Sequence, residues 1–447
     1  MASPMNFQES VDYIYSFVDF ERTGQITYNT RALDLKAFSE LLVLLSNPHE
    51  EFAVVHVAGT KGKGSTCAML ASVLRASGLR VGLFTSPHLL DVRERIQVNG
   101  KWIAKDSFAR ALSVIKPVHA HLGLTSRSYR TTFELLTAAA LLHFAEEHVE
   151  VAVLETGLGG RLDATNVVHP ALSVITRIGY DHTGILGGTL SAIAAEKAGI
   201  IKENIPVVVA DQKPEALTVI KRVAAEKNCP VVEAAREFRA TPSGTAPTQT
   251  VSFKGNGLKL EGIRLPLLGA HQIQNASCVV AAAKLLSSKF PSIDAASIGR
   301  GLAEVRLMGR VELLRADPFI VVDCAHNLES AESLVETLQE LCVSGKKIAI
   351  IGISTNKDAR AILAIMTRYF DKFLVTRADT KRAMSPVLLA DQLRGLGAQI
   401  EAFDSASDAA NAGLSMIGPE DLLCVTGSVY LAGQLRPFLV ESAGRFG

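Results

Sequence analysis

The sequence lacks the marks of several protein classes. Its six cysteines are scattered over 447 residues and form no C-x-x-C pair, a pattern that indicates buried thiols in a reducing compartment rather than a disulfide framework. Neither sign of charge is in excess, because 46 basic and 45 acidic residues give a formal net charge of +1. Nucleic-acid-binding proteins usually carry a clear basic excess. We therefore expect no nucleic-acid partner.

Long apolar runs are missing as well. The longest stretch without Asp, Glu, Lys or Arg, residues 265–283, contains a histidine, two glutamines and an asparagine, which makes it a poor membrane span. The first ten residues have neither a basic cluster nor a long apolar core, and both are features of a secretory signal. We expect a cytoplasmic protein without a membrane partner.

What the chain does contain is enough apolar sequence for sizeable cores. Its hydrophobic fraction is 48% and its charged fraction 20%, and at about 150 residues per domain its length favours two or three domains. Short apolar runs alternate with amphipathic stretches of helical length, which predicts an open α/β sheet with parallel strands and helices on both faces. The predicted strands are residues 54–57, 81–84, 151–154, 172–176 and 207–210, and the predicted helices are residues 66–76, 133–147 and 190–197.

The character of the chain changes after residue 240. Within residues 240–250, residues 241–248 read as a polar, proline-containing loop, followed by a small β-hairpin at 251–260 and a helix at about 274–286. Strand signals then return at residues 319–322, 348–351, 373–375 and 422–426. We predict a P-loop-containing, parallel-sheet N-terminal domain over residues 1–305 with a small β-hairpin insertion, and a smaller Rossmann-like α/β domain over residues 306–447.

The strongest local signal is a glycine-rich segment between a predicted strand and a predicted helix. It consists of Gly59, Thr60, Lys61, Gly62, Lys63, Gly64, Ser65 and Thr66. Glycines let the backbone approach phosphates, the helix N-terminus offers N–H groups, and Lys63 supplies positive charge. The segment departs from G-x-x-x-x-G-K-[ST], because Gly64 occupies the hydroxyl position. A flexible glycine turn is the alternative, and the strand before and helix after it favour a nucleotide-phosphate site.

Polar side chains follow three other strands of the same domain. Ser86, Glu155 and His182 each come shortly after a predicted strand, and the carboxyl ends of parallel strands meet at one edge of a sheet. Together they favour a Mg²⁺ site, although a single imidazole is unusual there. Taken singly, Ser86 could cap a turn and His182 could be a core histidine. Lys197, at the end of a short predicted helix, reads from the residues alone as an ordinary lysine placed against the helix dipole.

These segments occur in the order found in a known family. The matching segments are residues 56–65, 85–88, 155–166, 181–182, 196–199, 309–310, 323–327 and 426–428. The chain resembles the folylpolyglutamate synthases of the Mur ligase superfamily, including the bacterial forms that double as dihydrofolate synthase. The resemblance covers nearly the whole chain, and its twelve-residue segment 155–166 is highly specific. One departure is Lys61, which stands where the family commonly has asparagine.

The resemblance implies an ATP-dependent ligase. A folate carboxylate would attack the γ-phosphate of ATP to give an acyl phosphate, and the amino group of L-glutamate would displace phosphate. Lys63, Lys197 and His326 would be catalytic, with Lys197 as a carbamate. Two Mg²⁺ ions are expected, with Ser86, Glu155, His182 and carbamylated Lys197 as ligands. The N-terminal unit would be the ATP-binding central domain and the C-terminal unit the ligase domain.

The resemblance also assigns binding residues. Besides the glycine-rich segment, Asn275 would meet the adenine, while Arg310 and Asp323 would reach the nucleotide. From the residues alone, Asn275 and His326 read as helix-start or capping residues. The pterin-binding segments would comprise Thr131, Thr132, Phe133 and Glu134, and Leu162, Asp163 and Ala164.

Two other functions stay open at this point. One is a Mur-type amide ligase acting on a different carboxylate. The other is a phosphotransferase or a non-catalytic ATP-binding switch, which rests on the glycine-rich segment alone and leaves segments 155–166 and 323–327 without a role. The expected partners are small molecules, namely ATP, L-glutamate and a folate or dihydropteroate, and we expect a monomer.

Overall fold

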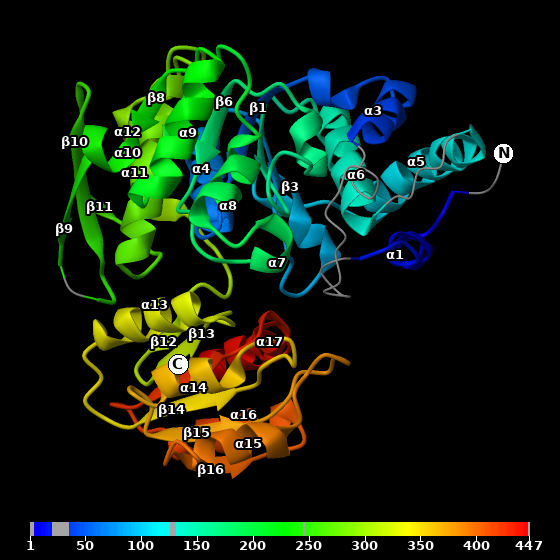
Figure 1. Ribbon diagram of the computed structural model, residues 1–447. Helices are drawn as coiled ribbons and strands as arrows, with labels where there is room; N and C mark the ends of the chain where they lie inside the picture. The colour runs from blue at the N-terminus through cyan, green and yellow to red at the C-terminus, as the bar shows by residue number, and fades with distance from the viewer. Residues whose placement is uncertain (1–3, 20–34, 126–130, 245, 446–447) are drawn as a thin grey trace. The chain divides into compact units, whose positions relative to one another are not determined.

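The computed structural model describes residues 4–19, 35–125, 131–244 and 246–445 (Figure 1). Residues 1–3, part of the N-terminal stretch considered above, lie outside the described residues. The chain forms two compact units. The first comprises Met1–Thr241, Val251–Ile263 and Ile273–Val305, and the second comprises Pro242–Thr250, Arg264–Gln272 and Arg306–Gly447. The domain limits at residues 305 and 306 stay a prediction.

The first unit is built on an eight-stranded sheet with the order β4-β3-β2-β5-β1-β6-β7-β8. Its strands are β1 Ala53–Ala58, β2 Val81–Phe84, β3 Ile96–Val98, β4 Lys101–Trp102, β5 Val151–Glu155, β6 Leu172–Ile175, β7 Val207–Val209 and β8 Val231–Glu233. Strands β2, β5, β1, β6, β7 and β8 pair in parallel, while β3 and β4 form an antiparallel ribbon at one edge. The predicted open α/β sheet is confirmed, with this antiparallel edge added to it.

Helices cover both faces of the sheet (Figure 1). They are α1 Phe7–Tyr15, α3 Leu35–Leu44, α4 Lys63–Ala76, α5 Lys105–Thr125, α6 Thr132–Glu146, α7 Thr183–Leu186, α8 Leu190–Ala198, α9 Pro214–Glu226, α10 Ala234–Glu237, α11 Ala270–Leu286 and α12 Ala295–Glu304, with 3₁₀ turns η1 Pro48–Glu50, η2 Val92–Arg95 and η3 Ala164–Val167. Residues of α3, α5 and α6 form one apolar core with the sheet, and residues of α8 and α9 form another. The central strand β1 contributes Val54 to the first core and Ala58 to the second.

A separate sheet of three strands, in the order β11-β10-β9, follows the large sheet along the chain. Its strands are β9 Arg239–Ser243, β10 Thr250–Gly255 and β11 Leu258–Arg264. The predicted hairpin corresponds to β10 and β11, whereas the prediction of a loop from residue 241 is wrong at its start, because β9 continues to Ser243. The strand β9 lies at the edge and is mostly exposed, where polar residues and a proline are tolerated. For that reason its composition resembles that of a loop.

The second unit has a six-stranded sheet with the order β12-β13-β17-β14-β15-β16, in which only β12 is antiparallel to its neighbour. Its strands are β12 Glu312–Ala316, β13 Phe319–Val322, β14 Lys347–Ile351, β15 Lys372–Val375, β16 Gln399–Ala402 and β17 Leu422–Thr426, and its helices are α13 Leu328–Gln339, α14 Ala359–Met366, α15 Pro386–Arg394, α16 Ala406–Met416 and α17 Val429–Arg445. Helices α13 to α15 share one core with this sheet. The predicted Rossmann-like unit is confirmed. Among the described residues of either unit, no helix combines the length and apolar character that crossing a membrane requires.

Candidate active site

The glycine-rich segment forms a tight loop between the centre of the large sheet and a helix. It leaves β1 after Ala58, and α4 begins at Lys63 directly after Gly62, whose φ is 85°. The backbone N–H groups of Thr60 and Lys61 donate to the carbonyl of Arg177 at 3.0 and 3.1 Å. The loop is therefore fixed at its start, and the helix N-terminus behind it leaves N–H groups for an anion.

Two glycines of this loop have no room for a side chain. A Cβ atom at Gly59 would lie 1.8 Å from Oγ1 of Thr176, and one at Gly62 would lie 2.2 Å from Oδ1 of Asn275. Asn275 thus contacts the loop from α11. Since α11 begins at Ala270, Asn275 lies inside the helix, and its interpretation as a helix-start residue is wrong.

We expect Gly62→Ala to weaken nucleotide binding about tenfold or more, because the added methyl group displaces Asn275 and because a positive φ costs about 1–2 kcal/mol for a residue with a Cβ atom. Calorimetric titration with ADP measures the affinity, and thermal unfolding measures the stability. Gly78→Ala is the matched control, since Gly78 has a φ of 92° and a methyl group added there would meet no atom within 4 Å. That variant should lose stability and keep its ADP affinity; equal ADP affinities in both variants would contradict the role of Gly62.

A buried carboxylate lies beside the start of α4. Glu155, the last residue of β5, is 3% exposed, and its Oε2 accepts a hydrogen bond from the backbone N–H of Ser86 at 3.1 Å. A Cβ atom on Gly64 would lie 3.4 Å from the same oxygen. The structure therefore brings Ser86 and Glu155 together at the glycine-rich loop, as the strand-end argument predicted.

A second acidic group reaches the loop from the segment after β6. Nζ of Lys61 lies 3.3 Å from Oδ2 of Asp181. Asp181 Oδ1 accepts the backbone N–H of His182 at 3.0 Å and lies 3.8 Å from Nε2 of the same residue. The positive charge that distinguishes Lys61 from the family's usual asparagine is thus paired with Asp181, and His182 lies directly next to that pair.

Lys197 is not an ordinary lysine at a helix end. Its side chain is 4% exposed, and Nζ donates to the carbonyl of Gly59 at 2.7 Å. Burial, together with the positive charge of Lys63, lowers the pKa of Lys197 to about 7. The interpretation from the residues alone is therefore wrong, because the helix end that carries Lys197 is buried against the glycine-rich loop.

The residues present suit a hard divalent cation. Among the described residues no group of three or more His, Cys, Asp and Glu side chains is arranged to hold a metal ion. The oxygen donors at the loop are the Glu155 carboxylate and the Ser86 hydroxyl, and a bound nucleotide would add phosphate oxygens. Such oxygen ligands are those that Mg²⁺ prefers, and the imidazole of His182 would be an unusual addition to them.

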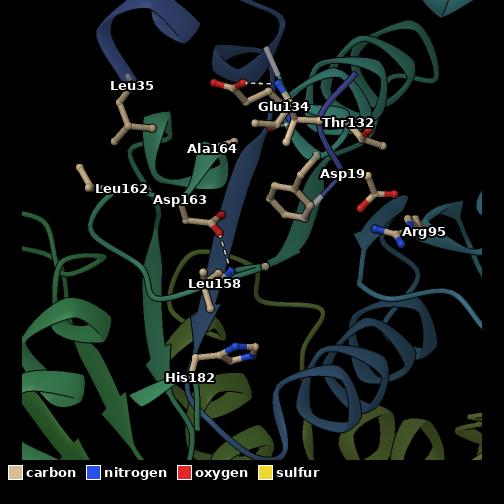
Figure 2. Close-up of a pocket in the computed structure, with 14 residues that line it drawn as sticks. Asp19, Leu35, Arg95, Thr132, Glu134, Leu158, Leu162, Asp163, Ala164 and His182 are labelled. Carbon is tan, nitrogen blue, oxygen red and sulfur yellow. Dashed lines mark hydrogen bonds between the residues drawn. The ribbon is translucent and has the colours of Figure 1, made fainter. Parts of the chain in front are cut away.

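A pocket in the first unit adjoins this cluster (Figure 2). It is lined by Val18, Asp19, Leu35, Arg95, Thr131, Thr132, Phe133, Glu134, Gly157, Leu158, Leu162, Asp163, Ala164 and His182. All seven residues of the two segments assigned to the pterin from the resemblance are in this set, although the segments lie far apart in sequence. His182 connects the pocket with the glycine-rich loop through Asp181 and Lys61.

The two acidic residues of those segments are held by local hydrogen bonds (Figure 2). Glu134 is 4% exposed and caps α6, with Oε2 accepting the backbone N–H of Thr131 at 2.7 Å. Asp163 is 5% exposed, and its Oδ2 accepts the backbone N–H of Leu158 at 2.9 Å. Burial raises the pKa of Asp163, against the effect of hydrogen bonds from Thr165, Leu158 and Gly157.

Sequence reasoning missed the residues that complete the pocket. Arg95 is 5% exposed at the end of η2, and its Nε donates to Nδ1 of His88 at 2.8 Å. Arg95 and Asp19 are drawn on the side of the pocket away from Leu162 and Asp163 (Figure 2). No sequence signal was available for Arg95, because the strand that follows it was not predicted, and nothing in the sequence around Asp19 or Leu35 distinguishes them from other residues of their segments.

The remaining predicted residues lie in the second unit. Asp323, directly after β13, is 7% exposed and accepts the backbone N–H groups of Val311 at 2.8 Å and of Ala325 at 2.7 Å. Its carboxylate lies near enough to Arg310 for that charge to oppose the rise in pKa that burial causes. His326 is half-buried, with Nδ1 2.8 Å from the carbonyl of Cys324. The N-cap of α13 is the next residue, Asn327, so His326 is not the cap.

Comparison with known proteins identifies both units. Residues 57–283 match the Mur ligase middle domain, and residues 309–429 match the glutamate ligase domain of Mur ligases. The dihydrofolate synthase/folylpolyglutamate synthase of Bacillus subtilis (strain 168) is 42% identical over 313 residues, which is 68% of this chain and 72% of the relative. The folylpolyglutamate synthase of Lacticaseibacillus casei is 33% identical over 98% of this chain and 99% of its own.

A solved structure agrees with these relatives. The Mycobacterium tuberculosis folylpolyglutamate synthase complexed with ADP aligns with a TM-score of 0.86 at 29% identity, covering 97% of this chain and 98% of that one. A phosphate loop on a parallel sheet, joined to a glutamate ligase domain, defines an ATP-dependent ligase of the Mur type. Within that class, the chain belongs to the folylpolyglutamate synthase/dihydrofolate synthase family. The predicted family, fold class and enzyme class are confirmed.

Proposed function

We propose that the protein adds L-glutamate to the carboxylate of a reduced folate at the expense of ATP, and that it accepts dihydropteroate in the same pocket. The carboxylate oxygen attacks the γ-phosphorus, and ADP leaves with the electrons of the broken P–O bond. The glutamate amine then attacks the acyl carbon, loses a proton and displaces phosphate. A carboxylate is a poor acyl donor until its oxygen becomes part of such a leaving group.

The observation that carries this proposal is the continuity of the phosphate loop and the pocket within one unit. Gly157 and Leu158, which line the pocket, follow Glu155 by two and three residues in the chain. The charge of Asp163 in the pocket is near enough to Lys197 to raise its pKa slightly against the effect of burial. A ligand in the pocket can therefore present a carboxylate toward the loop that binds the nucleotide.

Each group at the loop has a proposed part in that reaction. Lys63 and the N-terminus of α4 would stabilise charge on the γ-phosphate. Ser86, Glu155 and His182 would hold Mg²⁺, which when bound neutralises phosphate charge. Neutral Lys197 would add CO₂, releasing a proton, and the resulting carbamate would be a further anionic ligand. A lysine with a pKa near 7 has the uncharged amine that this addition requires.

The second unit supplies the remaining proposed roles. The resemblance assigns Arg310 and Asp323 to the nucleotide and His326 to catalysis, and these assignments stay predictions. The buried carboxylate of Asp323 orders the backbone at both Val311 and Ala325, so it holds in place the segment that carries Arg310.

The test offers purified protein ATP, labelled L-glutamate and either tetrahydrofolate or dihydropteroate. We expect release of ADP and phosphate only when both glutamate and an acceptor are present, together with a product heavier than the acceptor by one glutamate residue. Phosphate release without an amide product would contradict the proposal. An amide on another carboxylate, found by mass spectrometry in a substrate panel, would support the Mur-type alternative instead.

A further inference from the structure

A histidine is buried in the central strand of the large sheet. His56, in β1, is 0% exposed and pairs with Leu154 on β5 and Ser173 on β6. Its Nε2 lies 2.7 Å from Oγ1 of Thr165, which is also 0% exposed. Burial, with the charge of Lys202 adding to its effect, lowers the pKa of His56 to about 3. The ring is therefore neutral and carries one proton.

The hydrogen bonds from this ring have a definite direction. Thr165 Oγ1 lies 2.5 Å from Oδ1 of Asp163. The Thr165 hydroxyl donates to that oxygen, so the hydroxyl oxygen is left to accept from His56. The proton of His56 is then on Nε2. Consistently, Nδ1 is an acceptor, and it has no hydrogen-bond partner in the part of the chain that the structure describes.

This arrangement fixes the carboxylate of Asp163 in rotation. Oδ1 accepts the hydroxyl and, at 3.0 Å, the backbone N–H of Thr165, while Oδ2 accepts the backbone N–H of Leu158. Asp163 also lines the pocket. These donors define the plane of the carboxylate and occupy both lone pairs of Oδ1, so Oδ2 is the oxygen with the fewer donors. A pteridine ring carries N–H donors, one of which suits that oxygen.

We propose that His56 and Thr165 are positioning residues for folate binding, acting through Asp163 without touching the substrate. This inference rests on the proposed function, because it takes the pocket to be the folate site. A chain of buried polar groups in a sheet core is costly to place there without full hydrogen bonding. An apolar side chain at position 56 would fill the core as well. The histidine is therefore explained by Asp163, at the other end of this series of hydrogen bonds.

The decisive variant is Thr165→Val, which keeps the shape of the side chain and the backbone N–H to Asp163 but removes the hydroxyl. Thr165→Ser restores the hydroxyl and is its matched control. We expect Thr165→Val to raise the dissociation constant for dihydropteroate about tenfold, as loss of a hydrogen bond to a charged group does, and Thr165→Ser to stay within about threefold of the wild type. Calorimetry gives this constant, and the constant for ADP should not change.

Asp163→Asn separates failure of this inference from failure of the proposed function. If Asp163→Asn leaves dihydropteroate binding unchanged, the pocket is not the folate site and the proposed function loses its support. If Asp163→Asn weakens binding while Thr165→Val behaves as the wild type, the positioning role is overturned. Parallel losses of dihydropteroate and ADP affinity in Thr165→Val would also overturn it, because they would indicate a general structural role.

A second pair of variants decides the matter if Thr165→Val does not fold. His56→Leu removes the donor to Thr165, and His56→Gln places an amide N–H near the position of Nε2. We expect His56→Leu to weaken dihydropteroate binding severalfold with ADP binding intact, and His56→Gln to recover most of the loss. Equal dihydropteroate affinity in His56→Leu and the wild type would overturn the proposal.

Discussion

Replacing Lys63 by alanine is expected to lower kcat for folate glutamylation by about 10²–10³-fold, the range found when one preorganised donor to a transition-state charge is removed. Lys63 is the first residue of α4 and lies where the positive end of the helix meets the phosphate loop. In the proposed reaction its charge would add to that of the helix terminus at the γ-phosphate. Steady-state rates of ADP release at saturating ATP measure the effect.

Lys61→Asn is the matched control for that experiment. It removes a positive charge from the same loop and restores the family's common residue, but the charge removed is paired with Asp181 at 3.3 Å. We expect kcat to change less than about tenfold, since partly exposed ion pairs contribute little. Full turnover in Lys63→Ala, or equal losses in the two variants, would show that Lys63 has no special part in phosphate transfer.

Lys197→Ala is expected to lower kcat by a similar factor of about 10²–10³, because the variant cannot form the carbamate proposed as a metal ligand. The wild type should also depend on pH and CO₂. With a pKa of about 7, the uncharged amine is a minor form at pH 6 and the major form at pH 8. Activity in limiting bicarbonate should therefore rise with pH across this interval and should rise further when bicarbonate is added.

Two controls distinguish carbamate loss from unfolding. The folded state lowers the pKa of Lys197 from 10.5 to about 7, so between these two pH values the unfolded chain binds more protons at this group than the folded chain does. Burial of the amine therefore lowers the free energy of unfolding of the wild type as the pH falls from 10.5 toward 7. Lys197→Ala has no amine at this position, so its free energy of unfolding should not show this decrease. Short carboxylic acids added to Lys197→Ala should restore some turnover. A wild-type rate in Lys197→Ala would refute the carbamate.

The sequence predicted the location of site residues best where that location depends only on the course of the backbone. The loop before α4 and the strand ends at Ser86 and Glu155 follow from glycine spacing and from the direction of parallel strands, and the structure places them together. The prediction of an ordinary helix-end lysine at position 197 was wrong, because the environment of this side chain depends on burial against a loop that lies 138 residues earlier in the chain. No local pattern of residues around Lys197 contains that contact.

The residues that line the pocket were also not predictable from local sequence, because they come from segments that are distant in the chain. The segments containing Glu134 and Asp163 were assigned only through the resemblance, and their meeting is a product of the sheet order, which places β2, β5 and β1 side by side. Arg95 enters the pocket from a 3₁₀ turn whose position depends on the antiparallel edge ribbon. The hydrophobic pattern predicted neither that ribbon, whose strands have only 3 and 2 residues, nor the exposed edge strand β9, which is largely polar.

The strand β1 contains His56 and ends one residue before Gly59. The proposed positioning residue for folate and the nucleotide loop thus belong to one short piece of backbone at the middle of the sheet. An insertion or deletion within β1 would shift His56 and the nucleotide loop together, so the backbone there cannot change at one of them without changing at the other. Laboratory selection for new acceptors should therefore accumulate its substitutions at Asp19 and Arg95, on the side of the pocket away from Leu162 and Asp163 (Figure 2).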